Sequence, residues 1–146
     1  MTRPSTLAIF LVGAVLLAVG PAWAATYVVQ PNGSGDYPTI AAALAAAQSG
    51  DVIQLGSGTF TGTGNRDLSF GGKAVTVTSM AANAGAVVID VQGSAATPHR
   101  AFSFTSGETN AATLSHVTVR GGYISPGGGA LHIDGSSPTL DGCVFE

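Results

Sequence analysis

The sequence predicts an all-β fold: a right-handed parallel β-helix (a solenoid) with an N-terminal capping α-helix. After residue 50 the chain consists of short runs rich in β-branched residues, separated by Gly, Ser, Asn and Asp. This pattern is typical of many short strands. Two pairs of segments also resemble each other at offsets of 26 and 29 residues, and repetition at such periods indicates stacked structural units. Right-handed connections are expected because parallel crossovers are almost always right-handed.

The first 24 residues have the layout of a secretory signal peptide. Arg3 supplies a positive charge, the stretch from Leu7 to Val19 is apolar apart from Gly13, and "PAWAA" supplies small residues for cleavage. The apolar run is shorter than the roughly 20 residues of a membrane-spanning helix. We therefore expect cleavage after Ala24 or Ala25, no membrane span after cleavage, and a secreted, extracellular or cell-surface protein.

The next segment, "QPNGSGDYPTIAAALAAAQ", places glycines between a short apolar run and an alanine-rich stretch. This order also occurs in phosphate-binding loops, but the dinucleotide fingerprint G-x-G-x-x-G fails here because Pro38 takes the place of the third glycine. The Gly-Lys-Ser/Thr of a nucleotide-binding P-loop is absent as well. The sequence therefore predicts no nucleotide site.

The same segment has the signals of a short helix. Asp36 is placed to accept hydrogen bonds from the first helical N–H groups, and Pro38 suits the first turn, where no N–H is needed. Ile40, Leu44 and Ala47 follow at helical spacing. We expect this amphipathic helix to cover the open end of the solenoid, where core and strand edges would otherwise be exposed.

The repeats assign the faces of the later strands. "AFSF" (101–104) aligns with "ALHI" (130–133), and "TLSHVTV" (113–119) aligns with "TLDGCVF" (139–145). Because side chains alternate between the two faces of a strand, Ser103 and His132 are predicted to face outward. The residues predicted to face inward are Phe102, Phe104, Leu114, Val117, Val119, Leu131, Ile133, Leu140, Cys143 and Phe145.

Three further residues are interpreted as structural. Cys143 is the only cysteine and aligns with Val117, so we expect a small buried side chain and not a reactive thiol. His116 interrupts the inward pattern and is expected at a corner. His99, which comes directly before a predicted strand, is expected in a loop.

The segments "GSGDYPTIAAALAAA", "VVIDVQGSAATPHRAFSFTSGE" and "GGGALHIDGSSPTLDGCVF" resemble secreted right-handed parallel β-helix proteins of the pectin-lyase-like superfamily. The resemblance covers nearly the whole mature chain, as the N-terminal portion of such a protein. It implies a polysaccharide ligand and, in the enzymes of the superfamily, clustered carboxylates on the outer face of one sheet. Lyases of this kind use them to bind calcium beside a basic residue; hydrolases and esterases use them as acid, base or nucleophile.

No complete catalytic set is recognisable, so the catalytic residues are unknown. Asp90, Asp134 and Asp141 lie in the strand-rich half, but no two of them share a short motif. The best ligand candidates are His132 and Asp134, which would lie about 7 Å apart on the outer side of one strand, with Arg100 or Ser103 as a third group. They would bind a metal or a sugar hydroxyl. The alternative is a solvated strand face followed by an Asp-Gly turn.

Cofactor and nucleic-acid sites are not expected. Two ligands alone do not hold a metal, so no metal site is predicted, and calcium lacks a supporting ligand cluster. The chain has a net charge of −3 with only five Lys and Arg residues, which excludes the basic face of a nucleic-acid-binding protein.

The sequence thus predicts a signal peptide (1–24) and a parallel β-helix domain (25–146). Within this domain we expect an N-terminal cap at 27–50 and coils at 51–146. The chain stops directly after a core strand, so we expect its C-terminal end to continue into, or stack on, further coils. The predicted function is polysaccharide binding, or a part in a protein that processes pectin-like polysaccharide. Whether it is an enzyme stays open; a lyase, esterase or hydrolase would have its catalytic coils beyond residue 146.

Two alternatives remain. One is a surface adhesin, because "GGGALHI" followed by Phe145 resembles the Gly-Gly-Ala-Ile and Phe-x-x-Asn repeats of polymorphic outer-membrane adhesins, although the Asn is missing. The other is a purely structural extracellular module without a ligand.

Overall fold

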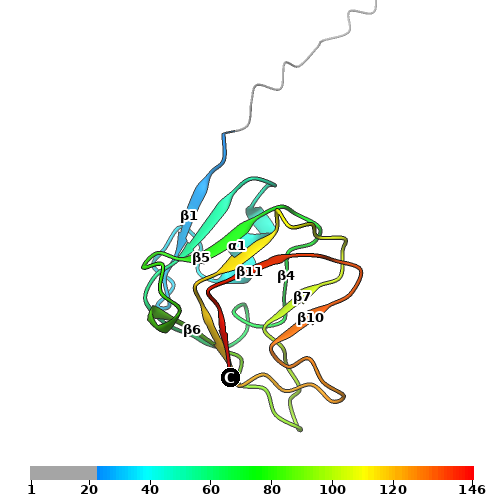
Figure 1. Cartoon of the computed structure of the whole chain (residues 1–146). Coiled ribbons are helices and arrows are strands. Elements are labelled where there is room, and N and C mark those ends of the chain that lie inside the picture. The colour runs from blue at the N-terminus through cyan, green and yellow to red at the C-terminus, as the bar shows by residue number, and fades with distance from the viewer. Residues whose placement is uncertain (1–22) are drawn as a thin grey trace, which may run out of the picture.

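The computed structural model describes residues 23–146 (Figure 1). Nearly all of the predicted signal peptide lies outside the described residues. The described part contains twelve short strands, helix α1 (Ile40–Ala46) and a single 3-10 turn, η1 (Ala84–Ala86). No helix within residues 23–146 has the length and apolar character needed to cross a membrane.

The strands form three sheets in which neighbouring strands run parallel. The first sheet has the order β1 (Thr26–Val29), β2 (Val52–Leu55), β5 (Thr76–Ser79), β8 (Thr113–Ser115), β11 (Thr139–Asp141). The second sheet has the order β3 (Gly58–Phe60), β6 (Val87–Asp90), β9 (Thr118–Arg120), β12 (Val144–Phe145). The third sheet has the order β4 (Leu68–Ser69), β7 (Phe102–Phe104), β10 (Leu131–Ile133). From β2 onward the chain passes through the three sheets in rotation.

The predicted fold class, an all-β right-handed parallel β-helix, is wrong. The described residues form three separate parallel sheets together with a helix, which is an α/β-like arrangement, and the strands do not close into a solenoid. The physical reason lies in α1, whose buried side chains Ile40, Ala43 and Leu44 belong to the main core. Parallel sheets whose faces are covered by other elements are typical of α/β proteins; the helix was predicted, but only as a cover over the end of an all-β solenoid.

The register between strands agrees with the internal sequence alignment. Phe102 pairs with Leu131 and Phe104 with Ile133 between β7 and β10. Leu114 pairs with Leu140, and Val119 with Phe145. The predicted correspondence of these segments is therefore confirmed, because residues that align in sequence lie side by side in adjacent strands.

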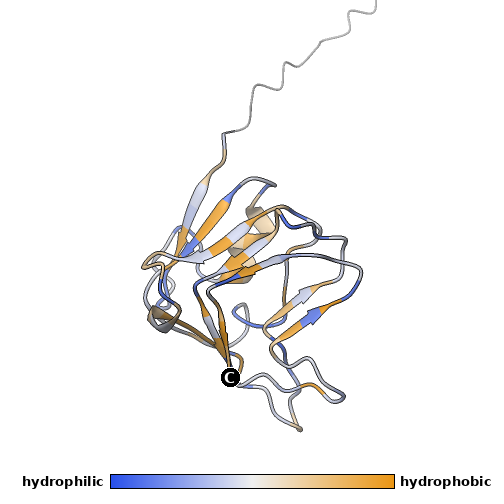
Figure 2. Ribbon diagram, viewed as in Figure 1, coloured by the Kyte–Doolittle hydropathy of each residue, from blue (hydrophilic) through white to orange (hydrophobic). Residues whose placement is uncertain are grey.

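The core is built from the inward side of each strand and from one face of α1. Hydrophobic residues are concentrated in these elements (Figure 2). Phe70, Phe102 and Phe104 are fully buried and pack together, with the ring centroids of Phe70 and Phe104 only 4.7 Å apart. Burying one such side chain contributes about 1.5–3 kcal/mol, so this aromatic cluster is a main source of stability for the third sheet.

The last strand of each sheet departs from the prediction of buried inward residues. Ile133, Leu140 and Phe145 are 44%, 38% and 43% exposed. Leu131 and Cys143 are only partly buried against the core. The register of these residues is right and their predicted burial is wrong, because strands β10, β11 and β12 each have a neighbour on one side only.

Helix α1 is short, and its ends are bonded to neighbouring loops. At the N-terminus Asn65 Oδ1 accepts a hydrogen bond from Ile40 N–H, and Thr39 Oγ1 accepts one from Ala42 N–H. At the C-terminus the ammonium of Lys73 donates to the carbonyls of Leu44 and Ala47. A seven-residue helix is not stable alone, so these bonds and the buried stripe of Ile40, Leu44 and Ala47 hold it; that stripe was correctly predicted.

The glycine-rich segment before α1 covers the free edge of β1. Asp36 N–H donates to Val28 O (2.7 Å), and Asp36 Oδ2 accepts from Val28 N–H (2.7 Å). The prediction that Asp36 caps the helix is therefore wrong; Thr39 is the N-cap. Gly35 lies so close to β1 that a Cβ there would be 2.3 Å from Val28 O. The glycine is needed for this close approach of two backbones.

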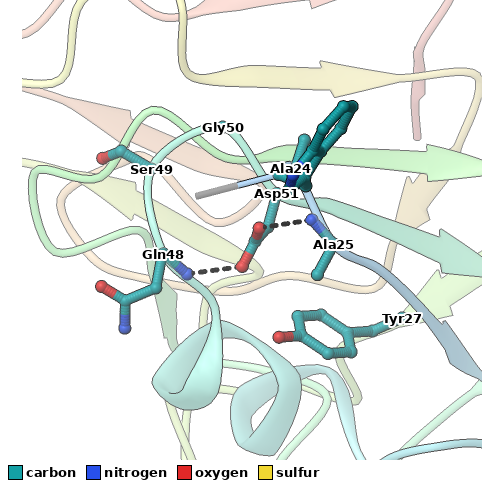
Figure 3. Close-up of a pocket in the computed structure, with 8 residues that line it drawn as sticks. Ala24, Ala25, Tyr27, Gln48, Ser49, Gly50 and Asp51 are labelled. Atoms are coloured by element: carbon teal, nitrogen blue, oxygen red, sulfur yellow. Dashed lines mark hydrogen bonds between the residues drawn. The ribbon is translucent and has the colours of Figure 1, made fainter. Parts of the chain in front are cut away.

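The carboxylates of Asp51 and Glu108 are buried, and each joins separate segments of the chain. Asp51, 5% exposed, accepts hydrogen bonds from Gln48 N–H (2.7 Å) and Ala25 N–H (2.8 Å), so it joins the residue before β1 to the loop after α1 (Figure 3). These two bonds lower the pKa of Asp51.

Glu108, 2% exposed, accepts hydrogen bonds from Gly72 N–H, Ser106 N–H and the Ser136 hydroxyl. These donors come from three successive connections between the third and the first sheet. Burial opposes the ionisation of Glu108, but the hydrogen bonds outweigh it, so its pKa is below the ordinary value. The carboxylate thus holds the three turns together.

We expect Gly35→Ala to destabilise the protein by about 1–3 kcal/mol, because the new methyl group overlaps the backbone of β1. Gly85→Ala is a matched control: Gly85 also lacks a positive φ, and its nearest atom would be 3.5 Å from the Cβ. This control is expected to change stability by no more than about 0.5 kcal/mol. Urea unfolding measures both, and equal stability of the two variants would contradict the close approach.

Glu108→Gln is expected to destabilise the protein by about 2–3 kcal/mol at neutral pH, because a charged acceptor of several bonds is lost. A carboxylate with a lowered pKa contributes its stability above its unfolded pKa, about 4.3, and loses it as the pH falls through the folded value. The difference from wild type should therefore shrink below about pH 4. Thermal unfolding across pH measures this, with Glu146→Gln as the exposed control; a difference independent of pH would count against the role of the charge.

Candidate functional site

The outer face of the third sheet carries a row of polar side chains. Ser69, Ser103 and His132 are in-register partners on β4, β7 and β10. Their neighbours Leu68, Phe102 and Phe104 are buried, so the serines and the histidine point away from the core. The predicted outward orientation of Ser103 and His132 is confirmed by this alternation.

Arg100 lies close to this row. Its Nη1 and the Cβ of His132 are 3.7 and 4.0 Å from the point that a Cβ on Gly128 would occupy. Gly128 has φ +78° and leaves this space free. The structure therefore brings together Arg100 and His132, two of the three predicted site residues, although they are 32 positions apart in the sequence.

Asp134 is not part of the same group. It follows the end of β10, where its N–H donates to Phe104 O (3.0 Å), so it lies at the far end of the strand from the Arg100 side. Within the part of the chain that the structure describes, the side chains of His132 and Asp134 form no hydrogen bond or ion pair with each other. The predicted His132–Asp134 pair is thus two separate exposed side chains, not a preformed binding pair.

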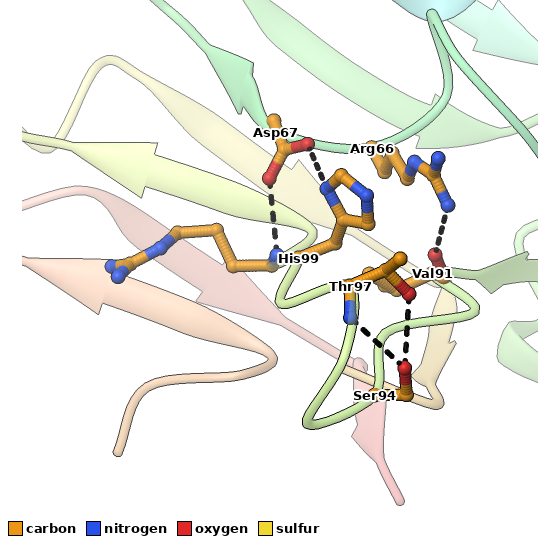
Figure 4. Close-up of polar contacts among 7 residues, drawn as sticks. Arg66, Asp67, Val91, Ser94, Thr97 and His99 are labelled. Atoms are coloured by element: carbon orange, nitrogen blue, oxygen red, sulfur yellow. Dashed lines mark hydrogen bonds and ion pairs between the residues drawn. The ribbon is translucent and has the colours of Figure 1, made fainter. Parts of the chain in front are cut away.

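A closer polar pair, Asp67 and His99, lies at the start of the third sheet (Figure 4). Asp67 Oδ2 is 2.6 Å from His99 Nδ1, and Asp67 Oδ1 accepts a hydrogen bond from Arg100 N–H (3.1 Å). Asp67 has φ +53°, in the left-handed region that aspartate tolerates better than most residues. The side chain of His99 is 26% exposed and that of Asp67 50%. The carboxylate thus orients the imidazole and the backbone that leads to Arg100.

The sequence interpretation missed Asp67 and treated His99 only as a loop residue. A usable signal was present: "DLSF" (67–70) matches "AFSF" (101–104) with its central serine. Aligning these segments places Asp67 beside the residues that precede β7, and the structure shows Asp67 N–H donating to Arg100 O (2.7 Å).

Tyr123 borders the same group. His99 and Tyr123 exchange two backbone hydrogen bonds of 2.9 Å, and Tyr123 is 41% exposed. Arg66 directly precedes Asp67, and its Nη1 donates to Val91 O (3.2 Å), as Figure 4 shows. The Asp67–His99 pair is thus bordered by an exposed aromatic residue and by the backbone of Arg100, while the guanidinium of Arg66 is directed to the end of the second sheet.

The arrangement suits binding better than catalysis. A carboxylate that holds one imidazole nitrogen leaves the other able to accept a proton. However, among residues 23–146 no hydroxyl is hydrogen-bonded to His99, and the nearby Ser94 and Thr97 hydroxyls bond to each other (2.9 Å). A base without a nucleophile or a second acid is not a complete catalytic set.

Metal and carboxylate chemistry find little support in the described residues. They contain no group of three or more His, Cys, Asp or Glu side chains that could hold a metal. Asp90, one of the predicted outer acids, forms an ion pair with Arg120 (3.0 Å). It is on β6 of the second sheet, away from Asp134 on the third and Asp141 on the first.

Of the residues interpreted as structural, Cys143 is only partly buried, and His116 lies at a corner as predicted. Burial raises the pKa of the Cys143 thiol, so this thiol is not activated. His116, between β8 and β9, has φ +55°, and the residue aligned with it, Gly142, has φ +58°. Both residues turn a corner of the chain, as predicted for His116.

Comparisons with known proteins found no match: no family model, no curated protein and no solved structure matches this chain. The resemblance to pectin-lyase-like proteins is therefore a prediction from sequence motifs.

We expect Asp67→Ala to destabilise the protein by about 1–2 kcal/mol, because it removes two hydrogen bonds and places alanine at a positive φ. Asp67→Asn keeps a side chain that tolerates this φ and keeps an acceptor for Arg100 N–H, so about half of that loss is expected. Asp134→Ala is the control and is expected to stay within about 0.5 kcal/mol of wild type. Thermal unfolding measures all three; equal effects at positions 67 and 134 would show that Asp67 orders nothing.

Proposed function

We propose that this chain is an exported polysaccharide-binding segment, and that its ligand is an anionic, pectin-like polysaccharide. The observation that carries the proposal is the position of Arg100 beside His132, at one end of the outward row Ser69, Ser103 and His132. The leader-like first 24 residues support export and an extracellular or cell-surface location.

The chemistry of the row suits a sugar chain that carries carboxylates. The planar guanidinium of Arg100 can donate two parallel hydrogen bonds to a carboxylate. The hydroxyls of Ser69 and Ser103 and the imidazole of His132 can donate to and accept from sugar hydroxyls. They stand on adjacent strands, about 4.8 Å apart, so they form a line along which an extended ligand can lie.

The aromatic ring of Tyr123 extends this surface. An exposed tyrosine offers an apolar face and a polar tip, which is what the two sides of a sugar ring require. Asp67 restrains the surface by bonding to His99 and to the Arg100 backbone, and a surface ordered before binding loses less entropy when the ligand arrives.

Attraction to the ligand must be local, because the whole chain carries a net charge of −3. Arg100 is the cationic side chain beside this row, whereas the Arg66 guanidinium donates to Val91 O and Arg120 is paired with Asp90 on the second sheet. Because exposed charges are screened by salt, affinity should fall as ionic strength rises.

Arg100→Ala is expected to weaken binding of the exported protein to polygalacturonate about tenfold or more, because a charge-assisted hydrogen bond contributes about 1.5–3 kcal/mol. Tyr123→Ala should weaken it as well. Arg120→Ala is the matched control: it removes an equal charge from another sheet and should leave affinity nearly unchanged. Calorimetry or affinity electrophoresis measures the effect.

A neutral polysaccharide such as dextran separates charge recognition from general sugar binding, since Arg100→Ala should matter only for the anionic ligand. If wild type binds neither acidic nor neutral polysaccharides, the proposal fails and a structural or adhesive module is the better interpretation. If Arg120→Ala weakens binding as much as Arg100→Ala, the ligand does not occupy the third sheet.

A further inference from the structure

The surroundings of Ala25 combine a predicted cleavage site with a buried carboxylate. Ala25 is the residue directly before β1, and its carbonyl accepts a hydrogen bond from Val52 N–H (2.8 Å). Its own N–H donates to Asp51 Oδ1 (2.8 Å). Trp23, by contrast, is 89% exposed, and Ala24 is exposed as well. Among the described residues, Ala25 is thus the first with a hydrogen bond to the rest of the fold, and it directly follows one of the two predicted cleavage positions.

We infer that removal of residues 1–24 creates an α-ammonium group on Ala25, and that this group forms an ion pair with the carboxylate of Asp51. Cleavage hydrolyses the Ala24–Ala25 peptide bond. Water supplies a hydroxyl to the Ala24 carbonyl carbon and a hydrogen to the Ala25 nitrogen, and the new amine takes up a proton at neutral pH. The neutral N–H donor that now faces Asp51 becomes a charged donor at the same position, and charge-assisted bonds are about twice as strong as neutral ones.

Asp51 is already arranged to receive a cation. It is 5% exposed, and its second oxygen, Oδ2, accepts Gln48 N–H (2.7 Å). Residues 23–25, Tyr27 and the loop 48–51 line a pocket of about 200 Å³ around this carboxylate (Figure 3). Loss of Trp23 and Ala24 removes part of this lining, so water and protons keep access to the new amine.

The geometry also decides between the two predicted cleavage positions. Cleavage after Ala25 would remove the carbonyl that accepts Val52 N–H and would leave Asp51 Oδ1 without the donor it has here. Cleavage after Ala24 keeps both contacts and adds a charge. The structure therefore favours a mature protein that starts at Ala25.

The ion pair stabilises the mature protein over a defined pH range. The other charged or titratable groups near Asp51 are Lys73, whose ammonium is bonded to the end of α1, and Tyr27, whose pKa is raised by burial and by Asp51. Tyr37 and Asp36 also raise the pKa of Tyr27, whose ring centroid is 5.2 Å from that of Tyr37. The pKa of Tyr27, raised above its ordinary value of 10.0, lies above the range in which an α-amine titrates.

The sign of the pH dependence follows for each partner. Pairing raises the pKa of the ammonium above its unfolded value of about 7.7–8.0, so its contribution is complete below that pH and is lost as the pH rises through the folded pKa. Hydrogen bonds lower the pKa of Asp51, so its contribution is present above about pH 4 and is lost as the pH falls through the folded value. The pair stabilises the protein between these limits.

The ion pair between the Ala25 ammonium and Asp51 forms only if the chain is exported as proposed above. The following experiment separates a failure of the ion pair from a failure of export. The full 146-residue chain, leader included, is expressed in a secreting bacterial host, and the exported product is analysed by N-terminal sequencing and intact mass. The expected first residue is Ala25. A product that stays inside the cell with its leader uncleaved overturns both proposals, whereas an exported product that starts elsewhere overturns only the ion pair.

The pairing itself is tested on the exported protein by the pH dependence of α-amine acylation, followed by mass spectrometry of the N-terminal peptide. The wild-type α-amine should titrate about 1 unit or more above the ordinary 7.7–8.0. Asp51→Asn should return it to that range. Asp36→Asn is the matched control, since Asp36 also accepts a β1 N–H but not that of Ala25, and should leave the titration unchanged.

If Asp51→Asn does not fold, the wild-type value decides alone. An α-amine that titrates at or below 8.0 in the folded wild-type protein overturns the ion pair.

Discussion

The hydrogen-bond ladder between parallel strands is the constraint on which this structure depends. From β2 to β9 each strand pairs with the one that comes a full passage through the three sheets later, for example Val77 of β5 with Leu114 of β8. Because equivalent residues lie side by side, each inward position continues a column of apolar side chains. Each connection must therefore bring the chain back into register with the preceding strand of the same sheet. This explains the many turns that contain a left-handed residue, such as His116 or Gly142.

The edges of the sheets are where this constraint becomes difficult, since an unpaired strand exposes its N–H and C=O groups. At β1 these groups are bonded by the segment that follows the strand, and the residue before the strand is bonded as well. Gly35 and Asp36 lie along the free edge of β1, and Asp51 holds the residue before it. At the opposite edge, β10, β11 and β12 have no comparable cover within residues 23–146, and their side chains Ile133, Leu140 and Phe145 are exposed accordingly.

The repeats in the sequence were sufficient to predict three pairs of neighbouring strands, β7 with β10, β8 with β11 and β9 with β12, because equal spacing and equal apolar pattern both follow from parallel pairing. They did not predict the fold class: the helix was predicted as a cover over the end of a closed solenoid, whereas the structure has three parallel sheets with the helix in the main core. The alignment left out "DLSF" (67–70), so it missed the position of Asp67 beside His99, to which Asp67 is hydrogen-bonded although 32 residues separate the two. Arg100 and His132 were predicted as ligands, but their proximity depends on the space above Gly128, a backbone feature with no signature in composition.

The distribution of the acidic residues decides what kind of chemistry this face can support. Of the eight acids in the chain, Asp36, Asp51 and Glu108 bind backbone N–H groups, and Asp90 is paired with Arg120. Asp67 holds His99.

A general acid or base must be able to change its protonation state near the substrate, and groups that fix loops by being ionised cannot do so without loosening those loops. The remaining acids, Asp134, Asp141 and Glu146, belong to the last passage through the sheets and lie apart from the Arg100 group. Beside the outer face of the third sheet lie the guanidinium of Arg100, the serine hydroxyls and the imidazole of His132. Such groups can donate hydrogen bonds to an anionic ligand, which is why the function we propose is binding and not carboxylate catalysis.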